Sequence, residues 1–575
     1  MNKLRELLLK YPQTTLVLII SIVYLYFQLD MLLRTTGDEK TYVAQALEMQ
    51  RDGHWFMQTL FDEPDYYKGP LHLIFLKIGF FLFGTNSMFA TVYMNFFGLI
   101  AATLLLYKMF VKELDDKSWG LFYASSFSVS IGLYSHMFAS QMEAELVIFY
   151  AIVMYLLHRL DYDNRLFINI LLWAFIGMTG WFKSPAYSVF LGFSVLVYWV
   201  ITLQIKERVL DKNTWISLFI GILIGFAAYI PILIYDGEVF IEKYIIKESM
   251  SKGANGVPWT EAFFPIFTYF VAPWMFAAVF SYLIALKTIF SMEARILNAK
   301  EMKLIKLAFS ILLPTLAFFT IHPYRGDIYA LPAVSATLLI AYLYWRAYVK
   351  QYEDVYVWMM RLSAIVLSIV PLVIVALYLH LSPMPEWWPE ILFPLALFSF
   401  VFTLGFIFYE SKNVARRGPV LLVVAFIPLF LTLGFTMRMI GKAEMLPAKE
   451  YIKKNNITKA LGDYNLHKSY WNEYGSLNTW LGHDVVGLHT QEKLFTFLRE
   501  GNSLIIPGEN RYSEFKEKLP DDMKLEDFDV FIWKRWLTHG KGPNGESMFL
   551  KYWKSKDITD IQRNFYILKL KEPKE

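Results

Sequence analysis

The chain has 575 residues, of which 56% are hydrophobic and 18% are charged, and its formal net charge at pH 7 is +4. This composition excludes an ordinary soluble globular protein and indicates an integral membrane protein. Because the sequence contains no cysteine, disulfide bonds, thiolate metal ligands and a cysteine nucleophile are excluded. A small net charge, with its basic residues in short loops, argues against nucleic acid as a partner.

Long apolar runs alternate with short polar loops along the first 440 residues. Because about 20 apolar residues cross a bilayer, the sequence predicts about thirteen membrane spans. They are expected at 14–33, 88–111, 119–137, 142–160, 167–182, 186–205, 215–235, 263–289, 304–321, 328–348, 358–381, 388–409 and 420–440. The run 71–83 is short for a span and is expected to be a juxtamembrane helix. No small-residue cleavage site follows the first span, which is therefore interpreted as a retained signal anchor.

Lysine and arginine gather at the amino terminus and in alternate loops, around 112–117, 159–165, 206–212, 287–306, 346–350 and 412–417. Basic loops stay on the cytoplasmic side of a membrane. The first large loop, residues 34–87, is therefore expected on the outer face. The same rule places everything after residue 440 outside the cytoplasm.

The first outer loop carries more charge than a simple connection needs. Asp38 and Glu39 follow the first span directly, where an acidic pair is costly unless it is solvated or partnered. An N-cap for the helix that follows explains the same pair without any function. Further along, Tyr66, Tyr67 and Lys68 combine rings that favour the headgroup level with a cation that attracts phosphate.

These motifs resemble the GT-C class of polytopic glycosyltransferases, in particular the bacterial branch of aminoarabinose lipid A transferases and protein O-mannosyltransferases. The matching residues, in chain order, are Asp38-Glu39, Tyr42, Gly53-His54-Trp55 and Tyr66 to Leu71. Two positions depart from the family. Gly69 stands where proline is usual, and Tyr67 stands where the aminoarabinose branch has an acidic residue, which leaves the acceptor open.

Two later outer motifs continue the resemblance. Glu143, at the start of the predicted span 142–160, matches an acidic residue of the family, with Glu145 as the competing choice. Capping of the helix amino terminus is the alternative explanation of both carboxylates. Lys183 stands in a Lys-Ser-Pro turn where the family has Lys-Gly-Pro, although a single snorkelling lysine needs no function.

The remaining family-like motifs are a long outer loop and a short outer turn. The loop 242–273 carries Lys247 and resembles a flexible lid, in which ammonium groups pair with phosphate. As a solvated loop it needs no chemistry. The turn has Arg325, Tyr329 and Pro332 at the family spacing, and an arginine grips phosphate bidentately.

The resemblance implies inverting transfer of a sugar from a polyprenyl-phosphate carrier to lipid A, another glycan or a protein, at the bacterial inner membrane. Such a reaction needs a base for the acceptor and cations for the leaving phosphate. The implied base is Asp38, with Glu39 and Glu143 positioning sugar or acceptor. The implied donor-binding residues are Tyr67, Lys68, Lys183, Lys247, Arg325 and Tyr329.

No cofactor and no metal are expected, because related members of the branch work without a metal and the histidines show no ligand spacing. A transporter or flippase of lipid-linked saccharides is the alternative, since it also needs many spans and buried charge. It predicts internal repeats and charges at the membrane midplane, which the sequence does not show.

After residue 440 the charge density becomes ordinary and no apolar run is long enough to span. Short strands are expected at 503–506, 529–532 and 564–568. The sequence therefore predicts a transmembrane GT-C catalytic domain over residues 1–440 and a soluble extracytoplasmic α/β domain over residues 441–575.

Overall fold

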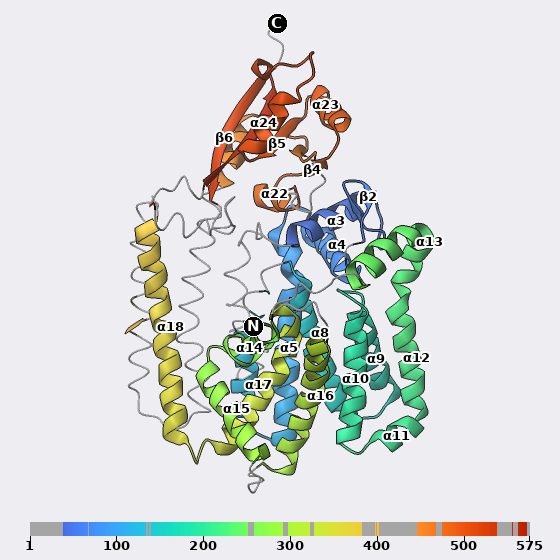
Figure 1. Cartoon of the computed structure of the whole chain (residues 1–575), viewed down its shortest axis with the longest axis vertical. Helices are drawn as coiled ribbons and strands as arrows, with labels where there is room; N and C mark the ends of the chain where they lie inside the picture. The colour runs from blue at the N-terminus through green and yellow to red at the C-terminus, as the bar shows by residue number, and fades with distance from the viewer. Residues whose placement is uncertain are drawn as a thin grey trace, which may run out of the picture.

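The computed structural model describes residues 38–66, 68–130, 132–133, 136, 140–250, 258–290, 297–321, 327–381, 397, 400–401, 445–466, 474–536, 555 and 562–571. In this part of the chain, long helices form a bundle, and a smaller unit with a β-sheet lies at one end of it (Figure 1). The bundle and the smaller unit are joined through helices of the first outer loop.

The bundle side of the molecule is built from helices that follow the apolar runs. Their bounds are α3 Glu39–Arg51, α4 Leu71–Phe83, α5 Met88–Leu114, α6 Lys117–Ser128, α8 Met142–Leu160, α9 Leu166–Thr179, α10 Ala186–Ile201, α11 Ile205–Leu210, α12 Lys212–Ala227, α13 Tyr229–Phe240, η1 Ile241–Met250, α14 Trp259–Phe267, η2 Tyr269–Val271, α15 Met275–Phe290, α16 Ala299–Ile321, η3 Asp327–Ala333, α17 Val334–Tyr348 and α18 Glu353–Leu381. Helix α4 has the bounds predicted for the juxtamembrane helix.

Within the described residues, three helices are long and apolar enough to cross a membrane: Met88–Leu114, Ala299–Thr320 and Tyr329–Tyr348. The bent pair Lys212–Ala227 and Tyr229–Ile246 makes a fourth if it counts as one span. The predicted spans 14–33 and 420–440, and nearly all of 388–409, lie outside the described residues. The total of about thirteen spans therefore stays a prediction.

Some of the predicted spans are not single straight helices. In the span expected at 119–137, helix α6 ends at Ser128. The run 215–235 is bent by 41° between α12 and α13, where Pro231 lacks the N–H that a continuous helix would use. The prediction of one span over 263–289 is wrong, because α14, η2 and α15 replace it. Pro273 lies between η2 and α15, and proline does not continue a helix from the preceding residues.

The helices pack closely where glycine removes side chains from the contact. Helix α9 packs along α12, and a Cβ added to Gly177 would lie 2.3 Å from the carbonyl oxygen of Gly221. Helix α5 packs against α4, α6 and α8, and a Cβ on Gly98 would lie 2.7 Å from the side chain of Ile148. Small residues at such crossings let helix backbones approach each other in a membrane bundle.

The first outer loop folds around a short hairpin, β1 Thr59–Leu60 paired with β2 Glu63–Pro64. Its turn has positive φ at Phe61 (59°) and Asp62 (60°). The carboxylate of Glu48, in α3, accepts hydrogen bonds from both backbone N–H groups, at 2.8 and 3.1 Å. This carboxylate therefore satisfies the donors that the turn exposes.

A five-stranded mixed sheet forms the centre of the smaller unit, which we call the C-terminal α/β unit (residues 461–571). The strands are β3 Leu461–Tyr464, β4 Val485–Leu488, β5 Ser503–Pro507, β6 Phe528–Trp536 and β7 Gln562–Leu570, in the order β4-β3-β5-β7-β6. β3 is parallel to β4 and β5, and β7 is antiparallel to β5 and β6. Helices α22 Tyr474–Leu481, α23 Gln491–Arg499 and α24 Glu509–Glu517 and the 3₁₀ turn η5 Leu525–Asp527 complete the unit.

The C-terminal α/β unit contacts the first outer loop through α22, which packs on α3. A Cβ on Gly475 would lie 2.3 Å from the carbonyl oxygen of Lys40, so the two backbones touch. Asn478 donates to the carbonyl oxygen of Thr85 at 2.8 Å, and Lys493 pairs with Asp62 at 2.5 Å. Helices α22 and α4 both pack on α3, which is buried along most of its length, including Glu39.

Candidate functional site

Two backbone hydrogen bonds join the first outer loop to the turn between α9 and α10. Gly69 donates its N–H to the carbonyl oxygen of Phe182, and Leu71 donates to that of Trp181, both at 2.9 Å. A proline at position 69 would have no N–H to donate. The hydrogen bond to Phe182 therefore explains why glycine, and not the proline usual in the family, occupies this position. The contact brings the segments that carry Lys68 and Lys183 side by side.

Lys183 meets two other predicted site residues. Its Nζ forms an ion pair with Oε1 of Glu143, at the start of α8, and lies 4.1 Å from the ring centroid of Tyr329, in η3. The side chains of Lys183 and Glu143 are only 14% and 8% exposed. A buried charge is tolerated when it is paired and hydrogen-bonded, and a cation over an aromatic face gains further attraction.

The second carboxylate of α8 binds a different partner. Oε2 of Glu145 lies 3.0 Å from Nδ1 of His72, which is buried near the start of α4. The other ring nitrogen of His72 lies 3.2 Å from the hydroxyl oxygen of Ser140. Glu143 and Glu145 thus belong to two adjacent clusters, and the choice of Glu143 over Glu145 as the functional acid stays a prediction.

Tyr42 connects the His72 cluster to Asp38. Its ring meets the ring of His72 edge to face, with centroids 5.2 Å apart. Its hydroxyl donates to Oδ2 of Asp38 at 3.1 Å. Asp38 is exposed at the start of α3, whereas Glu39 and Lys68 are buried. The arrangement leaves one carboxylate accessible beside a set of buried charged groups.

Three predicted site residues are not placed as side chains by the structure. Tyr67 and Arg325 lie outside the described residues. Lys247 lies in η1, where only the backbone is described at this position. Their predicted roles stay predictions.

The structure adds Asp236 to the first outer loop's partners. Tyr66 donates its hydroxyl to Oδ2 of Asp236, at a non-helical kink of α13. The pKa of Tyr66 is raised well above its usual value of 10.0, mainly by burial and further by the hydrogen bond to Asp236 and the charge of Asp236. The sequence analysis missed both Asp236 and His72. His72 lies within the apolar run 71–83, and Asp236 directly follows the apolar run 229–235; a polar group within or beside such a run is the signal that could have identified both.

An apolar cavity of about 470 Å³ lies between α9, α10, α12 and α13. Gly180 and Pro185, which flank the turn carrying Lys183, contribute to its lining. Tyr229 and Tyr244 also line it, and they donate hydrogen bonds to the carbonyl oxygens of Gly180 (2.5 Å) and Lys183 (3.5 Å). An apolar space therefore begins at the turn that carries the half-buried Lys183. No group of three or more potential metal ligands occurs among the residues that the structure describes.

The fold matches solved structures of one class of membrane enzyme. ArnT from Cupriavidus metallidurans bound to undecaprenyl phosphate aligns with a TM-score of 0.65 and 12% identity, over 97% of this chain and 98% of that chain. ArnT from the same organism in the apo state aligns with a TM-score of 0.59 and 16% identity, over 96% and 97% of the two chains. No protein-family model and no curated protein matches the sequence.

These similarities define the class first: the chain has the fold of a helical membrane glycosyltransferase of the GT-C type. The particular resemblance is to ArnT, the lipid A aminoarabinose transferase. The resemblance inferred from the first outer loop is thereby confirmed at the level of the fold.

Proposed function

We propose that the chain is an inverting glycosyltransferase. It moves a sugar from a polyprenyl-phosphate carrier, of the undecaprenyl-phosphate type, to lipid A, another envelope glycan or a protein. The observation that carries the proposal is the contact of Lys183 with the buried Glu143 and with the ring of Tyr329, made from a turn whose flanking residues Gly180 and Pro185 line the apolar cavity. A phosphate with a long apolar chain needs such a neighbouring cation and apolar space.

The proposed topology follows the basic loops. The amino terminus faces the cytoplasm, about thirteen spans cross the bacterial inner membrane, and the catalytic residues face outward. Residues 1–440 make up the transmembrane catalytic domain, and residues 441–575 make up a soluble extracytoplasmic domain. The contact of α22 with α3 supports a location of both the site and the C-terminal α/β unit on one side of the membrane.

In the proposed reaction with a hydroxyl acceptor, Asp38 accepts the proton of the acceptor. The acceptor oxygen forms a bond to the anomeric carbon on the face opposite the carrier. The bond between that carbon and the phosphate oxygen breaks, and its electron pair leaves with the lipid phosphate. The hydrogen bond from Tyr42 holds the Asp38 carboxylate in place while the carboxylate remains accessible.

Cations stabilise the charge that develops on the leaving phosphate. Lys68, Lys183 and Arg325 supply this charge in the proposal. Because Lys183 already pairs with Glu143, an entering phosphate competes with that carboxylate for the same ammonium group. The residues that complete the donor site are Tyr67, Lys247 and Tyr329, while Glu39 and Glu143 orient sugar or acceptor.

The proposal is tested by lipid, glycan and protein mass spectrometry on envelopes of a deletion strain. The strain is complemented with wild type, Asp38→Asn or Asp52→Asn, the last being a matched control because Asp52 is also exposed in the first outer loop. We expect Asp38→Asn to leave one glycoconjugate missing while its carrier-linked donor accumulates, with normal protein level. Asp52→Asn should restore the product.

Full complementation by Asp38→Asn would refute its role as the base. A changed distribution of the carrier-linked donor between the two leaflets, without a transfer defect, would favour the transporter alternative instead.

A further inference from the structure

A second cavity, of about 420 Å³, lies between α5 and α8 at the end of the bundle far from the candidate site. The cavity lies at the carboxyl end of α8, because Arg159 and Tyr162 line it. This end of α8 contacts α11, since the carbonyl oxygen of Leu160 accepts a hydrogen bond from Arg208 at 3.2 Å. Figure 1 shows α11 at the end opposite the C-terminal α/β unit. The proposed function makes no use of this cavity.

Basic side chains from two helices converge on the cavity. Lys108 and Lys112, one turn apart in α5, line it together with His158 and Arg159 of α8. Lys108 is exposed and forms no hydrogen bond or ion pair within the described part of the chain. Like charges four residues apart in a helix repel each other. An anion between the two lysines therefore turns an unfavourable contact into a favourable one.

Aromatic and apolar groups supply the rest of the lining. Tyr107, Tyr155 and Tyr162 line the cavity together with the basic groups, and Leu104 and Val111 add apolar surface. Tyrosine favours the headgroup level of a membrane, where one end of the ring meets water and the other meets hydrocarbon. Lysines that only mark the cytoplasmic end of a span do not require a cavity or neighbouring tyrosines. The combination of lysines, tyrosines and a cavity therefore indicates a binding site.

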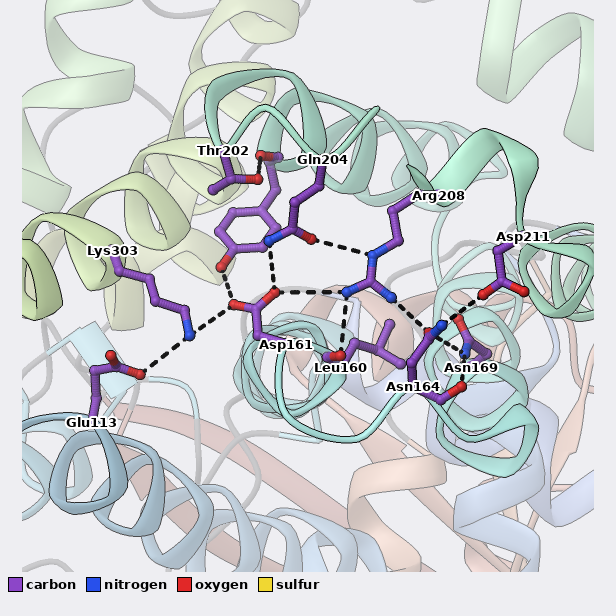
Figure 2. Close-up of polar contacts among 11 residues, drawn as sticks. Glu113, Leu160, Asp161, Asn164, Asn169, Thr202, Gln204, Arg208, Asp211 and Lys303 are labelled. Carbon is purple, nitrogen blue, oxygen red and sulfur yellow. Dashed lines mark hydrogen bonds and ion pairs between the residues drawn. The ribbon is translucent and has the colours of Figure 1, made fainter. Parts of the chain in front are cut away.

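The cavity wall is held by a polar network, part of which Figure 2 shows. Glu113 and His158 are buried in this network, whereas Tyr162 is exposed. Lys303 of α16 lies 3.4 Å from the Glu113 carboxylate and 3.1 Å from that of Asp161. Glu113 also contacts His158 at 2.8 Å and accepts a hydrogen bond from Tyr162. The cavity-lining His158 and Tyr162 are thus fixed before any ligand binds.

This network also determines the net charge of the cavity lining. The negative charge of Glu113 is compensated by Lys303, which additionally lies 4.2 Å from the ring centroid of Tyr162. Arg159 is bound in part by Asp163, at 3.2 Å. Among the described residues no ion pair joins Lys108 or Lys112 to a carboxylate, and Nζ of Lys112 lies 5.3 Å from the ring centroid of Tyr162.

We infer that this cavity binds the headgroup of an anionic phospholipid. The lipid phosphate pairs with Lys108 and Lys112, the tyrosines contact the glycerol region, and the acyl chains follow the apolar surface of α5. Basic pockets between membrane helices bind anionic headgroups in this way. In the proposed topology the lipid belongs to the cytoplasmic leaflet, far from the sugar-transfer site.

The test uses the purified full-length chain in detergent, with phosphatidylglycerol and phosphatidylcholine as probes. Bound lipid is counted by native mass spectrometry, and the midpoint of thermal unfolding is followed during lipid titration. Lys108→Gln with Lys112→Gln is compared with the control pair Lys206→Gln and Lys212→Gln. The control lysines are exposed near the same end and do not line the cavity.

We expect phosphatidylglycerol, but not phosphatidylcholine, to remain bound and to raise the unfolding midpoint. Loss of each lysine should weaken binding about fivefold, and loss of both about 25-fold. Arginine at both positions should retain binding, which separates loss of charge from misfolding. Equal weakening in the control pair overturns the inference. Inorganic phosphate that binds as tightly as phosphatidylglycerol also overturns it, because the site would then recognise a free anion.

Discussion

Replacement of Gly69 tests how the candidate site is assembled. An added Cβ would lie 2.2 Å from the carbonyl oxygen of Trp181, whereas real Cβ contacts stay beyond 3.0 Å. The Gly69→Ala variant must therefore separate the two segments by about 0.8 Å, and this lengthens the hydrogen bonds of Gly69 and Leu71. Overpacking and the weakening of two backbone hydrogen bonds together cost about 2–5 kcal/mol.

The effect on transfer should exceed the effect on folding. Lys68 and Lys183 lie on the two segments that move apart, and a misplacement of about 1 Å lowers an enzyme's rate about 100-fold. The assay measures transfer in envelopes together with the thermal unfolding midpoint of the purified protein. Gly237→Ala is the control, because nothing lies within 4 Å of a Cβ added there.

A proline at the same position gives a sharper comparison. Gly69→Pro restores the residue that is usual in the family, yet it removes the N–H that Phe182 accepts. We expect Gly69→Pro to lose transfer at least as severely as Gly69→Ala. Wild-type activity in either variant would show that the contact between the two segments does not position the site.

Three further changes test the buried pair and the contacts of the C-terminal α/β unit. Lys183→Met leaves Glu143 buried without its cation and should lower the free energy of unfolding by about 3–5 kcal/mol. The double variant Lys183→Met with Glu143→Leu should regain this stability but should not regain transfer. If the two substitutions instead lower the thermal unfolding midpoint additively, this reasoning is contradicted. Burial raises the pKa of Asp62, but hydrogen bonds from Lys493 and a neighbouring arginine outweigh it, so the net pKa falls below the usual 3.8. The stabilisation that the ionised Asp62 carboxylate contributes is therefore present above about pH 3.8 and is lost as the pH falls through the lowered pKa. The difference in unfolding midpoint between wild type and Asp62→Asn should shrink in that pH range. A difference that stays constant with pH would refute the stabilising role of the Asp62 carboxylate. Gly475→Ala should separate α22 from the backbone of α3 and expose the contact to limited proteolysis, with an unchanged cleavage pattern as the contrary result.

Many of the membrane-side helices and three of the five strands could be predicted from local pattern, whereas β3, β4 and the helices α22 to α24 were not predicted. The apolar run 71–83 has the bounds of α4, and the predicted span 142–160 has those of α8. The strands expected at 503–506, 529–532 and 564–568 fall within β5, β6 and β7. Run length and alternation succeed here because burial against lipid or against a sheet face selects apolar residues at regular spacing.

Two breaks in the bundle lie at prolines that the sequence shows, Pro231 and Pro273. The apolar runs around these prolines are nevertheless long enough to predict single spans. Hydropathy sums side-chain character over a window and does not register a missing backbone donor. The bend between α12 and α13 matters to the site, since α13 carries Asp236 to Tyr66.

Only the tertiary structure decides which charged groups meet. The sequence shows that Glu143, Lys183 and Tyr329 are candidates, but their contact joins α8, η3 and the turn after α9. It also leaves Glu143 and Glu145 as rivals, and packing assigns one to Lys183 and the other to His72. A local pattern records which residues face the protein interior, whereas the pairing of buried charges depends on distances between segments far apart in the chain.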